Sequence, residues 1–333
     1  MSPELGRDMV NLFSRMIVGI TMRMPRWFVR WISRRYVAGP TLDDAVKVMK
    51  RLQKEQACFT IDVLGEEIST LDEATFFLEE YQRVIKEIVE NNLDANLSIK
   101  PTAFGLLIDK EAGMANIERL VKNADEHDMF VRLDMEDHRV TQDTIQVVLD
   151  LHSSGITNVG CVLQGRLYRT IDDINAITKE LGPAADYRIC KGIYLESEDI
   201  AHTTRPAIIA ATNACIDAII SSGSYLAIAS HDHPIINHAL KALDRAGMGP
   251  DKDDVRNNSA KPRKSKGPGY EFQMLLGVRG PLRRKLRKEG HKTRVYIPYG
   301  EKWYEYSIRR LRENPTIATQ VMKAILMPWT NRP

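Results

Sequence analysis

Hydrophobic residues along the chain form two alternating patterns. Short apolar runs of strand length are followed by longer stretches in which apolar residues recur at helical spacing. The pattern predicts strands at 57–63, 95–100, 129–133, 158–163, 187–190, 225–229, 271–275 and 294–297. It predicts helices at 43–55, 72–90, 114–124, 141–151, 171–181, 206–221, 235–246, 281–288, 301–313 and 315–326.

A helix separates each predicted strand from the next. Connections of this length join parallel strands, and several of the runs are apolar throughout, as expected when both faces of a sheet are covered. Eight strand–helix units in roughly 270 residues match an α/β fold of the (βα)8 TIM-like barrel type. A doubly wound open sheet is the alternative, but no Gly-x-Gly-x-x-Gly follows the first strand.

Composition narrows the class of protein. The 333 residues are 43% hydrophobic and 27% charged, which is typical of a globular protein with a full core. The net charge of +3 is too small for a global cationic field, so no nucleic-acid partner is expected. The four cysteines form no CxxC pair, which favours buried thiols in a reducing compartment over disulfides or a zinc site. The oligomeric state stays open.

The first 40 residues differ from the rest of the chain. Residues 12–36 contain six arginines and no acid, and Trp27, Phe28 and Trp31 lie between the basic residues. This pattern suits a helix lying on an anionic membrane surface, although a helix packed on the domain or a transit peptide are alternatives. No run is long enough to span a bilayer, and no signal peptide is expected. We therefore divide the chain into a basic, aromatic segment (1–40) and a barrel domain (41–333).

One stretch interrupts the regular alternation. Residues 247–269 are polar, rich in Pro and Gly, and without apolar periodicity, which predicts a mobile insertion before the seventh strand. Its basic residues could contact lipid or a partner, but a solvated loop is the simpler interpretation. These residues are Lys261, Arg263, Lys264 and Lys266.

Polar residues end all eight predicted strands. In a barrel these ends meet at the face where active sites are found, so a polar ligand or an ion-pair network is expected there. The residues are Asp62 and Glu66; Lys100; Asp134 and Glu136; Gln164; Arg188, Lys191 and Tyr194; Ser230, His231, Asp232 and His233; Gln273; and Tyr296 and Tyr299. His231 and His233 could serve a metal-dependent hydrolase, but no other strand supplies a histidine, so no metal is expected.

A further feature lies beyond the eighth strand. Arg309 and Arg310 are adjacent on a predicted helix, and their side chains can grip one carboxylate from two sides. Tyr306 and Glu313 share a face with Arg309. On position alone, a solvated helix face is the alternative.

Short motifs in this order resemble those of the proline dehydrogenase family, in its monofunctional bacterial form, over roughly residues 36–326. They are DVLGE (62–66), SIKPT (98–102), RLDMED (132–137), VLQ (162–164), RICKGIYLE (188–196), ASHDHP (229–234), YEFQMLLGVR (270–279) and RVYIPYGEKWYEYSIRRLREN (294–314). The resemblance implies a distorted (βα)8 barrel that binds FAD, with extra N-terminal helices and a C-terminal helix over the barrel mouth.

The resemblance also implies roles for individual residues. Asp134 and Arg188 look like the catalytic residues, and Arg188 also contacts the flavin. The substrate residues are Lys100, Tyr194, Tyr296, Tyr306, Arg309 and Arg310, supported by ion pairs of Asp62, Glu66 and Glu313. The cofactor residues are Met135, Gln164, Lys191, Gly192, Ile193, Thr203, Arg205, Ser230 and His231. The sequence departs from the family at Cys190, often Val, at Ile193, often Ala, and at Asp232, which some members replace with Asn.

The implied activity is oxidation of L-proline to 1-pyrroline-5-carboxylate, with hydride transfer from C5 to the flavin and electrons passed to a membrane quinone. No residue is identified as the proton acceptor. The implied location is the cytoplasm, at the inner face of the cell membrane, with a mitochondrial location as the alternative. A hydroxyproline dehydrogenase, a metal-dependent barrel hydrolase and a catalytically silent binding barrel are the other functions considered.

Overall fold

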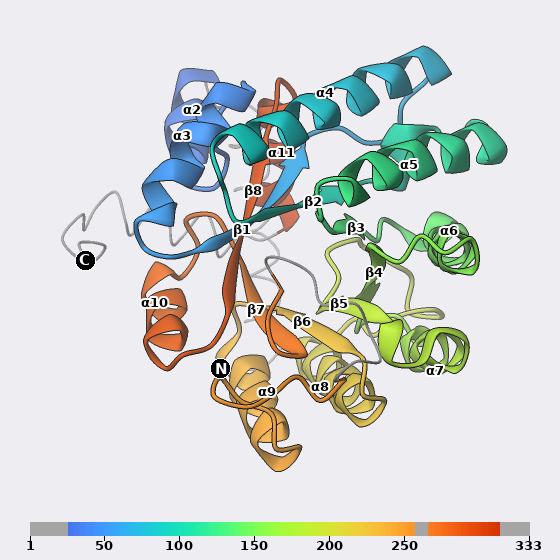
Figure 1. Ribbon diagram of the computed structural model, residues 1–333, viewed down its shortest axis with the longest axis vertical. Coiled ribbons are helices and arrows are strands. Elements are labelled where there is room, and N and C mark those ends of the chain that lie inside the picture. The colour runs from blue at the N-terminus through green and yellow to red at the C-terminus, as the bar shows by residue number, and fades with distance from the viewer. Residues whose placement is uncertain (1–25, 257–265, 314–333) are drawn as a thin grey trace, which may run out of the picture.

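Eight parallel strands close into a barrel in the computed structural model, which describes residues 26–256 and 266–313 without the side chains of Phe28, Ile32 and 309–313 (Figure 1). The strands follow one another around the barrel in chain order. They are β1 (Cys58–Val63), β2 (Ala95–Ile99), β3 (Val131–Leu133), β4 (Val159–Gln164), β5 (Asp186–Cys190), β6 (Tyr225–Ala229), β7 (Tyr270–Leu275) and β8 (Thr293–Tyr299). The predicted barrel and its eight strands are confirmed.

Helices surround the barrel, one after each strand (Figure 1). They are α4 (Leu71–Glu90), α5 (Lys110–Asp125), α6 (Thr141–Ser153), α7 (Thr170–Leu181), α8 (Arg205–Ser221), α9 (His233–Arg245), α10 (Gly280–Lys288) and α11 (Trp303–Glu313), with α2 (Arg26–Ser33) and α3 (Leu42–Gln53) before β1. Helix α5 begins four residues before its predicted start, because the carboxylate of Asp109 accepts the backbone N–H of Ala112 and caps a polar first turn. The helix predicted at 315–326 lies outside the described residues.

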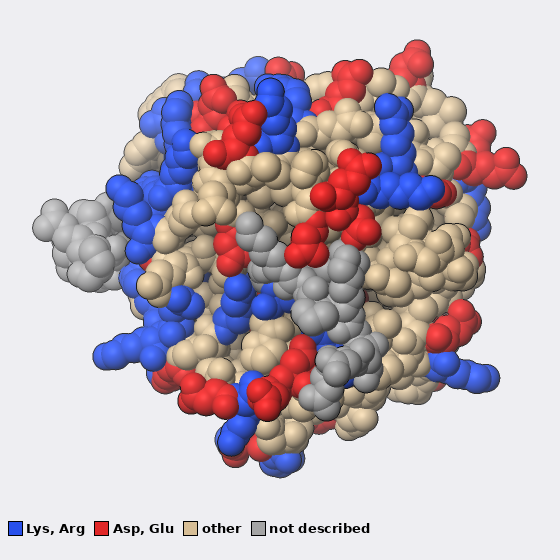
Figure 2. All heavy atoms as spheres, in the orientation of Figure 1, with Lys and Arg blue, Asp and Glu red and all other residues tan. Residues whose placement is uncertain are grey.

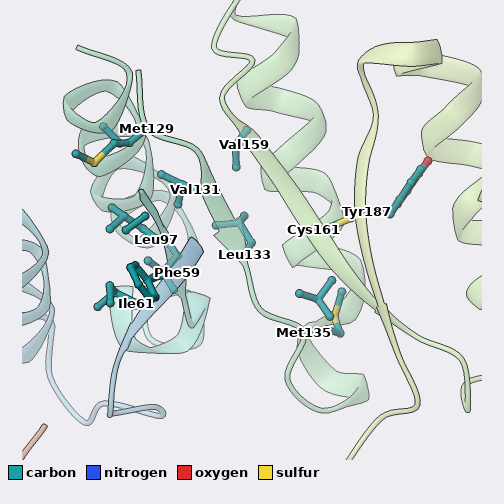
Figure 3. Packing of buried hydrophobic residues seen from close by; sticks show 14 of the residues in the cluster. Phe59, Ile61, Leu97, Met129, Val131, Leu133, Met135, Val159, Cys161 and Tyr187 are labelled. Carbon is teal, nitrogen blue, oxygen red and sulfur yellow. The ribbon is translucent and has the colours of Figure 1, made fainter. Parts of the chain in front are cut away.

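The two faces of each strand differ in polarity. Outward-facing residues such as Phe59, Ile61 and Leu97 pack against the helices and form the main hydrophobic core (Figure 3). The residues between them, such as Thr60 and Ser98, face the barrel interior and are buried as well. The strands are therefore covered on both faces, as expected, but the inner face is mostly polar.

The amino-terminal end of the barrel contains buried charges, which we call the floor cluster. Arg294 makes a two-point contact with Glu271, with Nε to Oε1 at 2.7 Å and Nη2 to Oε2 at 2.9 Å. Arg132 and Lys266 both pair with Asp186. The floor cluster consists of Arg132, Asp186, Lys266, Glu271 and Arg294.

Lys266 corrects one prediction. We expected a solvated basic residue in the insertion, but its side chain is buried, with Nζ 2.8 Å from the Asp186 carboxylate and 3.7 Å from the ring centre of Tyr225. The acids at the barrel floor attract this charge and hold the end of the insertion in place. Residues 257–265, which include Lys261, Arg263 and Lys264, lie outside the described residues.

The basic N-terminal segment is described from residue 26. Helix α2 packs against α11, and the guanidinium of Arg26 lies 5.0 Å from the ring centre of Tyr304. Trp27 and Trp31 remain 71% and 45% exposed. No helix in 26–256 or 266–313 is both long and apolar enough to cross a membrane. Acidic and basic side chains are interspersed on the face shown in Figure 2.

Candidate active site

Asp134, directly after β3, is the centre of a buried network at the carboxyl-terminal end of the barrel. Its Oδ1 accepts hydrogen bonds from Ser98 Oγ at 2.6 Å and Arg188 Nη1 at 2.7 Å, and its Oδ2 accepts one from the Tyr296 hydroxyl at 2.8 Å. These donors come from β2, β5 and β8, so they meet only across the barrel interior. The structure therefore brings together the two predicted catalytic residues, Asp134 and Arg188, with Tyr296.

Lys100 adds a second charge pair to this network. Its Nζ bonds to the Asp62 carboxylate at 2.5 Å and lies 3.9 Å from Asp134 Oδ2. Burial opposes the charged amine, but the two carboxylates outweigh it and raise the pKa of Lys100. Asp62, predicted as an ion-pair residue, is placed in a pair with Lys100. We call Asp62, Ser98, Lys100, Asp134, Arg188 and Tyr296 the mouth cluster.

Arg188 has hydrogen-bonding capacity left over. Only its Nη1 bonds to the mouth cluster, while the buried Nε and Nη2 have no hydrogen-bond partner among the described residues. Burial lowers the pKa of Arg188, yet a guanidinium remains charged in proteins. Unsatisfied buried donors on a cation are costly. An acceptor supplied by a ligand is therefore expected beside Arg188.

Glu136 connects the loops around the mouth cluster. Its carboxylate accepts the Thr102 backbone N–H at 3.0 Å and hydroxyl at 2.6 Å, and its carbonyl accepts Gln164 Nε2 at 2.8 Å. Burial is the largest influence on this acid and raises its pKa to about 7. Because Nε2 of Gln164 donates to Glu136, its Oε1 points away from Glu136 and lies beside Gly192.

Two polar residues of the site were not predicted. Ser98 bonds both Asp134 and Arg188, and Thr102 bonds Glu136. Both belong to the SIKPT motif. Ser98 lies two positions before Lys100 and therefore on the same side of the chain in an extended strand, a signal that could have identified it.

The loop after β5 approaches the end of β4 closely. Gly192 has a positive φ of 94°, and a Cβ atom there would lie 2.6 Å from Gln164 Oε1. Glycine is therefore required by both conformation and space. Tyr194 is held by its carbonyl, which accepts Arg166 Nη1, and Ile193 is 42% exposed. The structure thus places Gln164, Gly192, Ile193 and Tyr194 in one region of the barrel mouth.

Three charged residues form a separate group beside this loop. Lys191 Nζ lies 2.6 Å from Asp232 Oδ2, and Arg205 Nη2 lies 3.4 Å from Asp232 Oδ1. Ser230 Oγ accepts the backbone N–H of Asp232 at 3.1 Å. Thr203 precedes Arg205 in the loop before α8. Lys191, Arg205, Ser230 and Thr203 are predicted cofactor residues, whereas Asp232 was not assigned a role.

His231 does not have the arrangement that a metal site requires. Its Nε2 accepts the backbone N–H of Leu275 at 3.0 Å, so that lone pair is engaged in the fold. In the part of the chain that the structure describes, no group of three His, Cys, Asp or Glu residues is placed to hold a metal ion. His231 Nε2 would therefore have to leave Leu275 in order to bind a metal ion.

The remaining predicted residues are placed as follows. Met135 is buried in the main core after β3. Tyr306 packs with Leu64, the residue after β1, so α11 lies at the mouth end of the barrel. Glu66 lies in the loop after β1 at the same end. The side chains of Arg309, Arg310 and Glu313 lie outside the described residues, so the two-arginine grip stays a prediction.

A closed (βα)8 barrel with a buried charged cluster at its catalytic end defines the chain as an α/β-barrel enzyme. A sequence model of the proline dehydrogenase family matches residues 45–323. The chain belongs to the proline dehydrogenase family, as the motifs indicated.

Similar proteins agree with this assignment. Proline dehydrogenase 1 of Bacillus subtilis subsp. natto is 33% identical over 294 residues, which are 88% of this chain and 90% of that protein. Proline dehydrogenase of Deinococcus radiodurans is 30% identical over 89% of this chain and 90% of that protein. The family and the fold support an oxidoreductase that acts on proline.

A solved structure shares the fold at lower identity. Proline utilization A (PutA) from Bdellovibrio bacteriovorus, inactivated by N-propargylglycine, has a TM-score of 0.74 at 20% identity. The match covers 85% of this chain and 32% of that chain, so this chain spans about a third of its length. This likeness shows the barrel fold.

Proposed function

We propose that this chain binds FAD at the barrel mouth, oxidises L-proline to 1-pyrroline-5-carboxylate and delivers the electrons to a membrane quinone. The observation that supports it best is the state of Arg188, which is fixed by Asp134 and Ser98 through Nη1 while Nε and Nη2 are buried without a partner in the described ranges. Such donors suit the carbonyl and ring-nitrogen acceptors of a flavin.

When bound, FAD accepts the hydride that leaves C5 of proline. The protein supplies orientation and electrostatics. With FAD bound, Arg188 would supply positive charge and the N–H groups of Nε and Nη2 to the flavin as it gains electrons. Asp134 accepts three hydrogen bonds and holds Arg188 in one orientation. Burial, followed by the nearby Asp134 charge, raises the pKa of Tyr296 well above its usual value, so this hydroxyl keeps its proton and remains a donor.

Substrate binding is assigned from family likeness and from the positions of the residues. Arg309 and Arg310 are on α11, and Tyr306 of the same helix packs at the mouth end of the barrel. Two guanidinium groups can hold the carboxylate of proline in one orientation, which fixes C5 relative to the cofactor. Lys100 is proposed beside that carboxylate. The tyrosines proposed to surround the ring are Tyr194, Tyr296 and Tyr306.

The proposed cofactor contacts surround the same mouth. Gln164, Gly192 and Ile193 border the β4–β5 region, and Lys191 and Arg205 offer cations at its edge. The full set is Met135, Gln164, Arg188, Lys191, Gly192, Ile193, Thr203, Arg205, Ser230 and His231.

Turnover with different donors tests this function. Purified protein should reduce a soluble redox dye in the presence of L-proline, and Asp134→Asn should lower kcat/KM by about 10²-fold because Arg188 loses its charged anchor. A higher kcat/KM with hydroxyproline than with proline would favour the alternative substrate. No reduction of the dye with either donor would reject the proposal.

Attachment to a membrane is the second part of the proposal. The exposed Trp27 and Trp31 lie between Arg26, Arg30 and Arg34 on or next to α2, a combination suited to lipid headgroups. Further exposed apolar side chains lie in loops at the mouth end of the barrel, including Leu195, which is 91% exposed. These are Leu107, Ile108, Tyr168, Ile193 and Leu195. We propose peripheral attachment at the cytoplasmic face of the cell membrane, with residues 12–36 and the barrel mouth toward the lipid.

Liposome flotation with anionic vesicles tests the attachment. Trp27→Ser with Trp31→Ser should reduce binding several-fold and leave dye reduction intact, since neither residue belongs to the mouth cluster. The matched control is Val89→Ser with Val255→Ser, which removes two exposed apolar side chains at the opposite end of the barrel. Equal losses in the two double variants would contradict the proposed orientation.

A further inference from the structure

The group formed by Lys191, Arg205 and Asp232 is separate from the mouth cluster and contains an acid without an assigned role. Lys191 directly follows β5, Arg205 is the first residue of α8, and Asp232 lies between β6 and α9. The Asp232 carboxylate bonds one cation through each of its oxygens, at 2.6 and 3.4 Å. Burial opposes its charge, but Lys191 and Arg205 outweigh burial and lower the pKa of Asp232.

Two helix N-termini begin beside this group. Helices α8 and α9 are neighbours around the barrel (Figure 1). Neither the Thr204 side chain at the start of α8 nor the Asp232 side chain at the start of α9 makes a capping hydrogen bond. Uncapped first-turn N–H groups and the helix dipole favour a bound anion. The site thus combines two cations with two helix ends, and its only described internal anion is Asp232.

Asp232 occupies a position where its carboxylate has two alternative uses. As the N-cap residue of α9, it could accept the N–H of Ile235, the third residue of the helix, in the usual capping geometry. In the structure it bonds Lys191 and Arg205 instead. A carboxylate that leaves the two cations therefore has a second set of donors within its own helix.

We propose that Asp232 substitutes for the phosphate groups of FAD before the cofactor binds and is displaced from Lys191 and Arg205 when the cofactor's diphosphate binds. This inference rests on the proposed function, which places FAD at this mouth. Asp232 keeps the two cations paired, and it competes with the diphosphate for the same donors. Its charge therefore limits how long FAD is retained.

The rate at which holoenzyme releases flavin on dilution, followed by the gain in flavin fluorescence, measures this competition. Asp232→Asn removes the competing charge and should slow release about tenfold at low salt, an effect that shrinks as salt screens the cations. Asp232→Glu keeps the charge and should release flavin at nearly the wild-type rate. Asp217→Asn is the matched control, because Asp217 is an acid on α8 that pairs with His238 and Arg245 instead. Melting curves of each variant confirm that the fold is retained.

The possible results separate this inference from the function on which it rests. Release from Asp232→Asn that is as fast as wild type, or faster, overturns the inference while the flavin in the wild-type protein still supports the proposed function. An equal slowing of flavin release by Asp217→Asn also overturns the inference, because the slower release would then come from the protein's net charge and not from Asp232. Wild-type protein purified without any flavin overturns both.

Discussion

Two buried glutamates in the same barrel have opposite pKa shifts. At the mouth end, burial raises the pKa of Glu136 to about 7, and its direct partners are the neutral donors of Thr102. At the floor, burial of Glu271 is outweighed by the charges of Arg294 and Lys266, which hold its pKa well below its usual value. The difference therefore comes from the partners of each acid, since both are buried.

The mouth cluster and the floor cluster also differ in how completely their charged groups are paired. Each described cation of the floor cluster has a carboxylate partner within it, although the 2.8 Å contact of Lys266 Nζ with Asp186 is an ion pair without hydrogen-bond geometry. The mouth cluster leaves Arg188 Nε and Nη2, together with Asp62 Oδ2, without a hydrogen-bond partner among the residues described. A closed set of ion pairs holds a fold together, whereas unsatisfied buried donors indicate a place for a ligand. The floor is therefore structural, and the mouth is the binding end.

The largest expected effect is at the floor. Glu271→Gln leaves Arg294 buried with its charge uncompensated, so the free energy of unfolding should fall by about 3–5 kcal/mol. Denaturant unfolding measures it. The matched control is Glu67→Gln, which removes an exposed partner of Arg139 and should change stability by less than about 1 kcal/mol. Similar losses in the two variants would remove the distinction between a structural floor and the rest of the molecule.

Arg188→Met tests the mouth end. The loss of a positively charged donor from the proposed site should lower kcat/KM for proline by about 10²–10³-fold. The melting temperature should fall less than for Glu271→Gln, because Lys100, 3.9 Å from Asp134 Oδ2, still compensates the Asp134 charge. The control is Arg139→Met, which removes an exposed arginine outside the mouth cluster and should leave kcat/KM unchanged. A stability loss as large as that of Glu271→Gln, with activity retained, would assign the mouth cluster a structural role.

A pH series distinguishes the two glutamates. Because the pKa of Glu136 is raised in the folded state, its contribution to stability is fully present below pH 4.5 and is lost as the pH rises through about 7. Glu136→Gln should match the wild type at pH 5 and exceed its stability at pH 8 by up to about 3 kcal/mol. Unfolding curves at both pH values measure it. A variant that is equally destabilised at both would show that the carboxylate is needed in its charged form.

The sequence predicted the barrel because strand and helix identity depends on local patterns. Apolar runs such as 95–100 and helical stripes such as 72–90 lie within about one residue of the observed elements. The floor cluster was not predicted, and Lys266 was expected in solvent. Its partner Asp186 is far away in the sequence, and a polar loop pattern gives no sign that one lysine enters the barrel.

The sequence predicted only part of the site, because contacts across the barrel leave no local pattern. Asp134, which directly follows β3, was identified by its position at a strand end, and Arg188 by the motif that contains the fifth strand. Ser98 lies inside a strand, and its two bonds depend on residues that face it across the barrel, 36 and 90 positions away. The function of Asp232 depends on whether its carboxylate caps α9 or pairs with cations, and only the folded arrangement distinguishes these uses.

An anaerobic absorption spectrum tests the central claim that the mouth end holds a flavin and oxidises proline there. The purified wild-type protein should show a flavin band at about 450 nm, and this band should bleach on addition of L-proline. Arg188→Met should retain the band and bleach far more slowly. A colourless wild-type protein, or a band that proline leaves unchanged, would contradict the account.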